Sequence, residues 1–274
     1  MCRLILNLVT AITLTMVFCS TLTAAPIPRM EAVPGGVVHI PLGPEKPKRV
    51  EYHHRPVMLI KKGPNWTAIV GIALATPVKT QNLMVTAVNG EQTTLQFDLH
   101  DKSYKSQHIT LKNKRQVNPT SLDLKRIRRE KKQMIKAFQH WSPNINPDSA
   151  FILPAKGPFS SPFGLRRFFN GEPRKPHSGL DIAADEGSPL KAPASGRILL
   201  TGHFFFNGNT VMIDHGQGLI SMLCHLQQID VEPGQMVHQG ERIGRVGHTG
   251  RATGPHVHWS VSLNNNRIDP TLFF

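Results

Sequence analysis

Two segments, PHSGLDIAA at residues 176–184 and TGPHVHWSV at residues 253–261, decide how this chain folds. In the second segment His256 and His258 alternate with apolar side chains, which is the period-two pattern of a half-buried strand. Residues i and i+2 of a strand project from the same face, so both histidines face one space while the apolar side chains pack behind them. Two imidazoles side by side are suited to a metal site.

The first segment supplies the remaining donors. Its proline and glycine argue against a helix, and Leu180–Ala183 has the pattern of a strand start, with Asp181 on the opposite face from its apolar neighbours. His177 then approaches from the preceding loop. A catalytic zinc ion has three protein ligands, drawn from His, Asp, Glu and Cys, and an open position for water. His177, Asp181 and either His256 or His258 make up such a set.

The other histidine of that pair and His225, in the segment SMLCHL at residues 221–226, are left over. A neutral imidazole near a metal can take a proton from bound water or stabilise an oxyanion. The surplus histidines therefore favour a catalytic site over a closed structural one. Cys224 precedes His225, but alternation along a strand predicts that its side chain faces the opposite way, as a small core residue.

The order of these motifs, His-x-x-x-Asp, then His-Leu, then His-x-His, resembles the LytM and lysostaphin-type zinc metallopeptidases, which cut peptide bonds in bacterial cell walls. The resemblance covers about residues 152–274 and takes in SPFGLR at 161–166, GSPLKAPASG at 187–196, IDHG at 213–216, GQMVHQG at 234–240 and GHTGRATGP at 247–255. A lone His-x-His motif is a weak signal, whereas this ordered series is specific.

Carried over residue by residue, the resemblance implies that His177, Asp181 and His258 are zinc ligands and that His225 and His256 are catalytic. Spacing alone does not separate the two histidines of the closing pair. The implied activity is zinc-dependent hydrolysis of the cross-links between peptidoglycan stem peptides. The alternative is a non-hydrolytic regulator or binding module that acts on other cell-wall enzymes.

The resemblance has one departure and leaves two arginines unassigned. Many relatives carry Tyr-Ala before the middle histidine, where this chain has Leu223-Cys224, so a tyrosine hydroxyl has no counterpart at that point. Arg166 and Arg167 are candidates for contacts with substrate carboxylates, but surface arginines are common at such positions, and we leave both outside the catalytic set.

The composition is that of a folded protein with an excess of positive charge. At 274 residues, with 39% hydrophobic and 18% charged residues, the chain is long enough for two domains. Its 32 Lys and Arg against 18 Asp and Glu give a formal net charge of +14, which favours anionic partners such as cell-wall polymer, lipopolysaccharide or nucleic acid. An exported protein does not meet nucleic acid, so we expect a cell-envelope partner.

Residues 1–25 resemble a secretory signal peptide, with Arg3 at the start, an apolar run over residues 4–18 and a small-residue site, TAA, at residues 23–25. We therefore expect an exported, periplasmic protein. Cleavage after Ala24 or Ala25 would leave it without a stable membrane span. Retention of the segment as an anchor is the alternative. Cleavage leaves Cys224 as the single cysteine, so no internal disulfide is expected.

Residues 26–115 are predicted to form an accessory β-sandwich, because short β-rich runs are separated by turn signals. Asn89-Gly90 in this region predicts a tight hairpin. The region resembles the accessory domain that precedes the peptidase in some Gram-negative relatives. Whether residues 30–145 block the groove until they are displaced stays open at this stage.

A basic helical linker, residues 116–150, is predicted to follow. Residues 102–136 hold twelve Lys and Arg against two acidic residues, and NPTS at 118–121 predicts a helix start with an apolar stripe that extends to Trp141. One interpretation is a solvated charged face over a stripe that packs between domains. The other is a surface that binds an anionic cell-envelope polymer.

Residues 151–274 are predicted to form the zinc metallopeptidase domain. Strands punctuated by glycine and proline continue to the C-terminus without a long helical pattern. This pattern indicates an open or barrel-like antiparallel sheet with a groove on one face. The whole chain is thus predicted to be mostly β.

Overall fold

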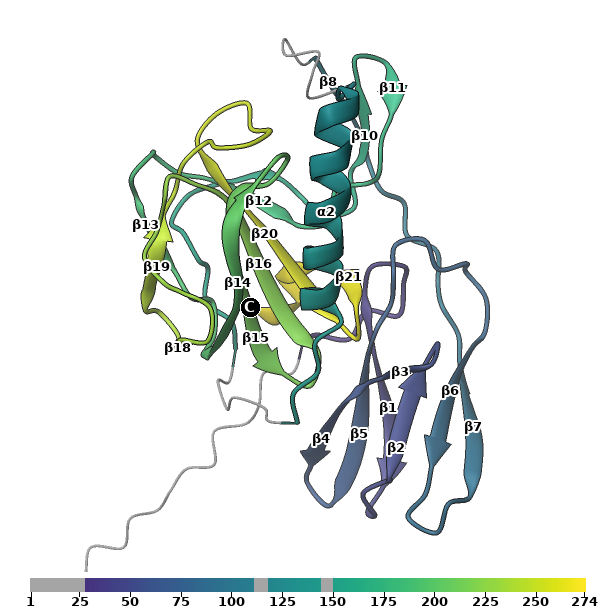
Figure 1. Ribbon diagram of the computed structural model, residues 1–274. Helices are drawn as coiled ribbons and strands as arrows, with labels where there is room; N and C mark the ends of the chain where they lie inside the picture. The colour runs from purple at the N-terminus through teal and green to yellow at the C-terminus, as the bar shows by residue number, and fades with distance from the viewer. Residues whose placement is uncertain (1–27, 111–117, 144–149) are drawn as a thin grey trace, which may run out of the picture.

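The computed structural model describes residues 28–110, 118–143 and 150–274 (Figure 1). Within these ranges the chain is mostly β, with one α-helix, α2 (Ser121–Phe138), and one short 3-10 helix, η1 (Pro270–Phe273). The predicted signal peptide, residues 1–25, lies outside the described residues. In the part of the chain that the structure describes, no helix is both long enough and apolar enough to cross a membrane.

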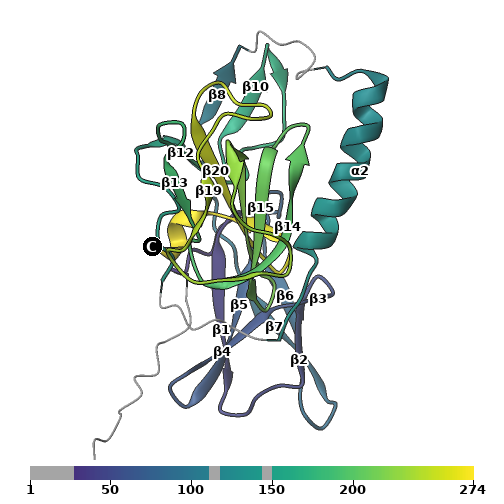
Figure 2. The ribbon, with the colours of Figure 1, turned by 60° about the vertical axis from the view of Figure 1, so that its left-hand side comes forward.

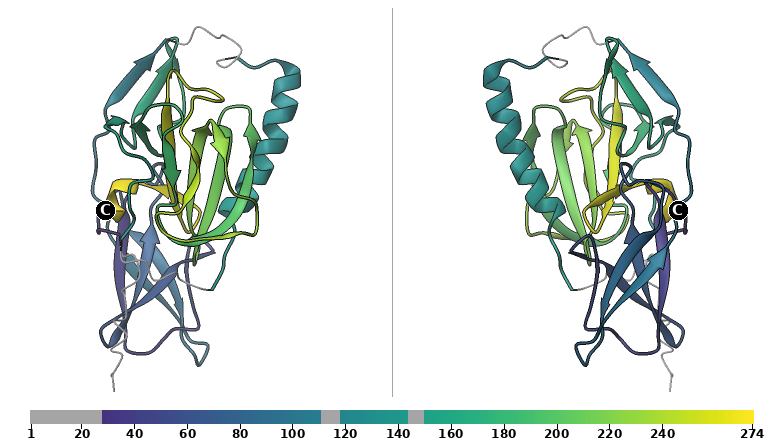
Figure 3. Two further views of the ribbon diagram at one scale, coloured as in Figure 1. Left: turned by 90° about the vertical axis from the view of Figure 1, so that its left-hand side faces the viewer. Right: turned by 90° about the vertical axis from the view of Figure 1, so that its right-hand side faces the viewer.

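The N-terminal region is a sandwich of two antiparallel sheets, as predicted (Figure 3). One sheet has the order β1-β5-β4, with β1 Val37–Gly43, β5 Asn65–Gly71 and β4 Met58–Lys62. The other has the order β3-β2-β6-β7, with β3 Arg55–Pro56, β2 Arg49–Tyr52, β6 Gln81–Thr86 and β7 Gln92–Phe97. The predicted hairpin joins β6 to β7, and Gly90 takes a φ of 89°, a left-handed conformation that glycine adopts without strain.

The C-terminal region is an eight-stranded antiparallel sheet in the order β18-β14-β15-β16-β20-β12-β9, with β21 beside β20. Its strands are β9 (Phe159–Ser161), β12 (Leu180–Ala183), β14 (Gly196–Phe204), β15 (Gly208–Gly216), β16 (Leu219–Leu226), β18 (Met236–Val237), β20 (His256–Leu263) and β21 (Asn266–Ile268). A smaller sheet of β13 (Pro189–Lys191), β19 (Arg242–Arg245) and β17 (Gln228–Ile229) adds its buried side chains to the same core.

The two regions share one hydrophobic core. Val37, Met58 and Ile69 of the sheet β1-β5-β4 belong to the same buried cluster as Trp259 in the middle of the C-terminal sheet. Alternate residues of the same strands fill the inside of the sandwich. Strand β5 is therefore buried on both faces, which explains why its sequence is nearly continuously apolar instead of alternating.

Polar contacts reinforce this junction. The backbone N–H of Gly71 donates to Asn264 Oδ1 at 2.7 Å, and Asn264 Nδ2 donates to the Gly71 carbonyl at 3.1 Å. The side chain of Asn264 is buried, so these hydrogen bonds satisfy polar groups that water does not reach. The N-terminal sandwich is thus fixed to the end of the C-terminal sheet (Figure 2).

Helix α2 lies against the C-terminal sheet, next to β14 (Figure 2). The helix starts within the predicted segment 118–121, where Thr120 caps it: its Oγ1 accepts from the backbone N–H of Asp123, whose carboxylate accepts from the backbone of Thr120. Phe138, at the C-terminal end of α2, is 3% exposed and packs on Met212 and neighbouring side chains of the sheet. The helix ends at Phe138, so the predicted apolar stripe does not reach Trp141 within it. The interpretation in which the stripe packs between domains is wrong, because α2 covers one face of a single sheet.

A third small sheet joins the two regions. Strand β8 (Ser106–Ile109), which follows the sandwich in sequence, pairs in parallel with β10 (Arg166–Phe169), which in turn pairs with β11 (Glu172–Pro173). Residues from the N-terminal part of the chain thus lie beside a strand of the C-terminal region. This arrangement positions β10 close to the candidate site described below.

Candidate active site

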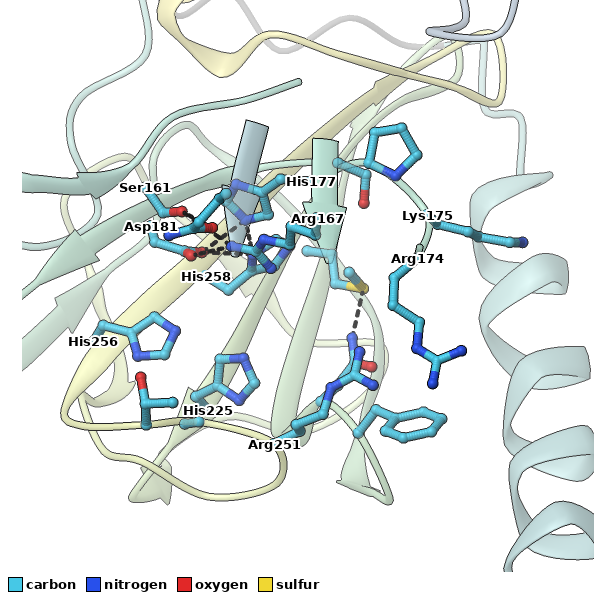
Figure 4. A pocket seen from close by; sticks show the side chains of 18 of the residues that line it. Ser161, Arg167, Arg174, Lys175, His177, Asp181, His225, Arg251, His256 and His258 are labelled. Atoms are coloured by element: carbon cyan, nitrogen blue, oxygen red, sulfur yellow. Dashed lines mark hydrogen bonds and ion pairs between the residues drawn. The ribbon is translucent and has the colours of Figure 1, made fainter. Parts of the chain in front are cut away.

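Strands β12 and β20 bring the predicted ligands together. They pair antiparallel with Asp181 opposite His258, so the two side chains are direct cross-strand neighbours on one face. On the other face Ile182 and Trp259 are 0% exposed, which confirms the predicted alternation. His177 comes from the loop before β12 and points toward the same place (Figure 4).

Three donor atoms of these residues converge. His177 Nε2 lies 2.9 Å from Asp181 Oδ1, His258 Nδ1 lies 2.7 Å from the same oxygen, and the two nitrogens are 2.9 Å apart. All three residues are largely removed from solvent. We call them the metal group, because one ligand atom from each lies within 4.8 Å of the others.

The hydrogen-bond network assigns the protons of this group. His177 Nδ1 is 2.8 Å from the Pro162 carbonyl, an acceptor only, so Nδ1 carries the proton and Nε2 the lone pair. Ser260 Oγ donates to the Ser178 carbonyl at 2.8 Å and must therefore accept from His258 Nε2, also at 2.8 Å. His258 Nδ1 is then left with its lone pair.

Three lone-pair atoms, two nitrogens and a carboxylate oxygen, therefore face one another at hydrogen-bonding distance with no proton among them. Such an arrangement is repulsive unless a cation lies at its centre. Two imidazoles and one carboxylate are also a donor set that zinc takes in catalytic sites. The residues present thus fit a divalent metal ion, and their partners hold each ring in the tautomer that a ligand needs.

Arg167 fixes the carboxylate from behind. Its Nη2 donates to Asp181 Oδ2 at 2.9 Å and to Ser161 Oγ at 3.1 Å. Only Oδ1 of Asp181 is then directed at the metal group. Burial alone would raise the pKa of Asp181, but the neighbouring His177 and His258 rings hold that pKa well below the usual range. The carboxylate is therefore ionised at any physiological pH.

His225 and His256 lie beside the metal group, with ring centroids 4.8 Å apart. His225 Nδ1 donates to the Thr249 carbonyl at 2.8 Å, and His256 Nδ1 donates to the Gly254 carbonyl at 2.8 Å. In the neutral form of each ring, Nε2 therefore keeps the lone pair. Burial, with repulsion from His256 and His258, lowers the pKa of His225 to about 3, which keeps this ring neutral.

The backbone at His225 departs from a regular strand. Its φ is 68°, an uncommon left-handed conformation for a residue other than glycine, and its N–H donates to the Asn207 carbonyl at 2.8 Å. The register of β15 and β16 shifts at the same place. As a result His225 and Met222, three residues apart, line one cavity, where strict alternation would put them on opposite faces.

Cys224 has no chemical role in this arrangement. It is 1% exposed within a hydrophobic cluster, as the core interpretation predicts, and burial raises the pKa of its thiol to about 12. A protonated, buried thiol is neither a nucleophile nor a metal ligand. The facing argument behind that interpretation fails, however, because the left-handed turn at His225 breaks the alternation on which it depended.

A cavity of about 830 Å³ joins these groups, and we call it the groove cavity. It is lined by the metal group, His225 and His256 on the sheet side, and by Leu124, Ile127 and Met134 of α2 on the other. Figure 4 shows α2 running along one side of the site. The sequence predicts the groove and the five histidine and aspartate side chains, but not that α2 forms a wall.

Sequence reasoning missed two supporting residues. Ser260 orients His258, and Arg167, which we left outside the catalytic set, holds Asp181. Ser260 shares the facing of His258 on β20, a signal that could have found it. Arg167 has no such signal, because its contact with Asp181 depends on how β10 is placed in space.

Comparison with known proteins identifies a family. The model of the peptidase family M23 matches residues 175–270, and that of the peptidase family M23 N-terminal domain matches residues 30–102. The crystal structure of a Pseudomonas aeruginosa protein described as a peptidase M23 superposes with a TM-score of 0.76 at 43% sequence identity, covering 89% of this chain and 95% of that one.

Curated relatives match part of this chain. DD-carboxypeptidase/endopeptidase Mpg of Neisseria meningitidis is 40% identical over 111 residues, which is 40% of this chain and 26% of the relative. Peptidoglycan DD-endopeptidase ShyA of Vibrio cholerae is 36% identical over 120 residues, which is 43% of this chain and 28% of the relative. The match thus spans about a quarter of the length of each relative. Together with the crystal structure, which is similar over almost its full length, these likenesses show that the chain belongs to peptidase family M23.

Proposed function

We propose that this chain is a zinc-dependent endopeptidase that hydrolyses peptide cross-links in bacterial peptidoglycan. The observation that carries the proposal is the metal group of His177, Asp181 and His258, whose lone pairs converge beside two further histidines in one cavity. Relatives from Vibrio cholerae that are named peptidoglycan DD-endopeptidases support the substrate class.

His177, Asp181 and His258 are the proposed zinc ligands, through Nε2, Oδ1 and Nδ1 respectively. Zinc bound there supplies Lewis acidity, which polarises a carbonyl and lowers the pKa of water from about 15.7 to roughly 7. Arg167 keeps Asp181 oriented, and Ser260 keeps the proton of His258 away from the metal side.

His225 and His256 are the proposed proton carriers. Hydrolysis adds the oxygen of water to the carbonyl carbon, breaks the carbon–nitrogen bond and delivers a proton to the leaving amine. Because both rings commit Nδ1–H to a backbone carbonyl, Nε2 is the atom that takes the proton. A ring donates a hydrogen bond to the oxyanion only after it has gained that proton, so acceptance precedes donation.

The setting of this activity is part of the proposal. We place the protein in the periplasm after export, with peptidoglycan stem peptides as substrate. We assign residues 26–115 to an accessory domain, 116–150 to a linker and 151–274 to the peptidase domain. Lys125, Arg129 and Lys132 lie on the exposed face of α2, where they are available to an anionic envelope polymer.

Mass analysis of fragments released from purified, cross-linked peptidoglycan tests the proposal. The zinc-loaded protein should convert cross-linked dimers to monomers, and a chelator should abolish the conversion. His225→Ala and His256→Ala should lower turnover by orders of magnitude while they retain zinc, whereas Asp181→Ala should also lose zinc. No release by zinc-loaded protein would reject the endopeptidase and favour a regulatory or binding module.

A further inference from the structure

The groove cavity is strongly cationic. Five Lys and Arg side chains line it, against two carboxylates. Both carboxylates are already engaged: Asp181 belongs to the metal group, and Glu130 bonds to Arg126 and accepts from the backbone N–H of Phe205 at 2.8 Å. The positive charge of the cavity is therefore not balanced by acidic groups within its lining, even before a metal ion adds to it.

Three of the cations gather on the side of the cavity that faces α2. Arg174 and Lys175 come from the loop after β11, and Arg251 comes from the loop before β20. Figure 4 shows Arg174 and Arg251 extending into the space beside His225, with Lys175 directed toward α2. Arg174 also pairs with Glu172, an exposed residue that does not line the cavity. We call Arg174, Lys175 and Arg251 the cation cluster.

Arg251 is held in place rather than free to leave the cavity. Its guanidinium lies over the ring of Phe206, 4.3 Å from the ring centroid, and its backbone N–H donates to the Phe206 carbonyl at 2.8 Å. Gly250, at a φ of 72°, lets this loop approach the backbone of Gly208 so closely that a Cβ would clash. The cation is thus built into the fold.

Keeping this charge in the cavity costs free energy. Burial, with repulsion from Arg167 and Arg174, lowers the pKa of Arg251 to about 10. Like charges gathered in a partly desolvated cavity are typical of a binding site, because an anionic ligand offsets both the desolvation and the repulsion. Planar guanidinium groups suit a carboxylate in particular, which they can bind through two hydrogen bonds.

The rest of the lining limits the shape of that ligand. Leu124, Ile127 and Met134 of α2 and Met222 of β16 present apolar surface to the same cavity. An extended polyanion would leave this apolar surface unmatched. A peptide residue with a short apolar side chain and a free carboxylate meets both the cations and the apolar wall.

We propose that Arg174, Lys175 and Arg251 form a carboxylate-binding subsite that selects peptide substrates with a free carboxylate close to the bond that is cut. This inference rests on the proposed peptidase function and names the chemical class of its substrate. The subsite acts on binding and orientation and takes no part in proton transfer.

Two cross-linked peptides that differ at one group test the subsite: one carries the free carboxylate, and the other carries the carboxamide. With the zinc-loaded full chain, kcat/KM should be roughly 10- to 100-fold higher for the acid than for the amide, as charge-assisted hydrogen bonds predict. Arg174→Gln and Arg251→Gln should each reduce that ratio toward one, because they slow cleavage of the acid more than cleavage of the amide.

Lys191→Gln is the matched control, because Lys191 is exposed on β13 and does not line the cavity, so the acid preference should persist. Equal cleavage of acid and amide by the wild type would overturn the subsite and leave the peptidase function standing. Cleavage of neither peptide would instead reject the proposed function. Inhibition by inorganic phosphate as strong as that by a carboxylate product peptide would show a general anion site and overturn the selectivity.

Discussion

Replacing Ser260 with alanine should weaken metal binding although no ligand is changed. Ser260 Oγ accepts from His258 Nε2 and donates to the Ser178 carbonyl, each at 2.8 Å. These two successive hydrogen bonds keep the lone pair of His258 on Nδ1. Alanine removes the acceptor. The imidazole proton is then free to move to Nδ1, where it competes with the metal.

The size of the effect follows from burial. Ser260 is 0% exposed, so water does not replace the lost hydroxyl. Mutating a group that orients a metal-binding histidine lowers the metal affinity roughly 10- to 100-fold. At about 1.4 kcal/mol for each factor of ten, this corresponds to about 1.4–2.8 kcal/mol of binding free energy. We expect the zinc affinity of Ser260→Ala to fall within that range.

Competition with a chromophoric zinc chelator at fixed pH and salt measures the affinity. Ser221→Ala is the matched control, because Ser221 is also 0% exposed and its Oγ lies 2.9 Å from Nε2 of His215, a histidine outside the metal group. The control should lose stability and keep its zinc affinity. An unchanged affinity in Ser260→Ala would refute the proton assignment, and an equal loss in both variants would show general destabilisation instead.

Three further predictions concern neighbouring groups. Arg167→Lys should reduce zinc affinity roughly tenfold in the same titration, because one ammonium group does not reproduce the fixed geometry with which the guanidinium holds Asp181. Phe138→Ala should lower the free energy of unfolding by about 3 kcal/mol in urea titrations, since it empties the contact between α2 and the sheet; a change under about 0.5 kcal/mol would contradict that packing. The free energy of unfolding of the metal-free protein should decrease as the pH falls from 6.5 to about 3. The pKa of His225 is 6.5 in the unfolded state and about 3 in the folded state, so the unfolded state binds the extra proton in this range. His225→Gln should remove this part of the pH dependence of the free energy of unfolding.

The common facing of His256 and His258 was predictable from sequence because it is local. His256 and His258 are two residues apart on one strand, and period-two alternation fixes their common face before any tertiary contact is known. Turn chemistry is equally local, which is why Asn89-Gly90 predicted the hairpin and the segment 118–121 predicted the start of the helix.

The residues that support the ligands were not predictable in the same way. Arg167 reaches Asp181 because β10 is paired with β8, whose partner residues lie 60 positions earlier in the chain, and no local pattern encodes such a pairing. The left-handed backbone at His225 likewise depends on its bond to Asn207 across the hairpin. The position of α2 was missed because an amphipathic pattern shows which face is buried but not which sheet covers it.

The shared core makes the sandwich and the peptidase sheet one cooperative unit. Burial of Val37, Met58, Ile60 and Ile69 against the C-terminal cluster contributes about 6–12 kcal/mol at roughly 1.5–3 kcal/mol for each side chain, which is comparable to the whole stability of an ordinary domain. Swinging the sandwich away as a rigid lid would forfeit that contribution. A protein shortened to residues 151–274 would expose the same apolar face to water, so its aggregation would be an expected result and its inactivity would say nothing about inhibition.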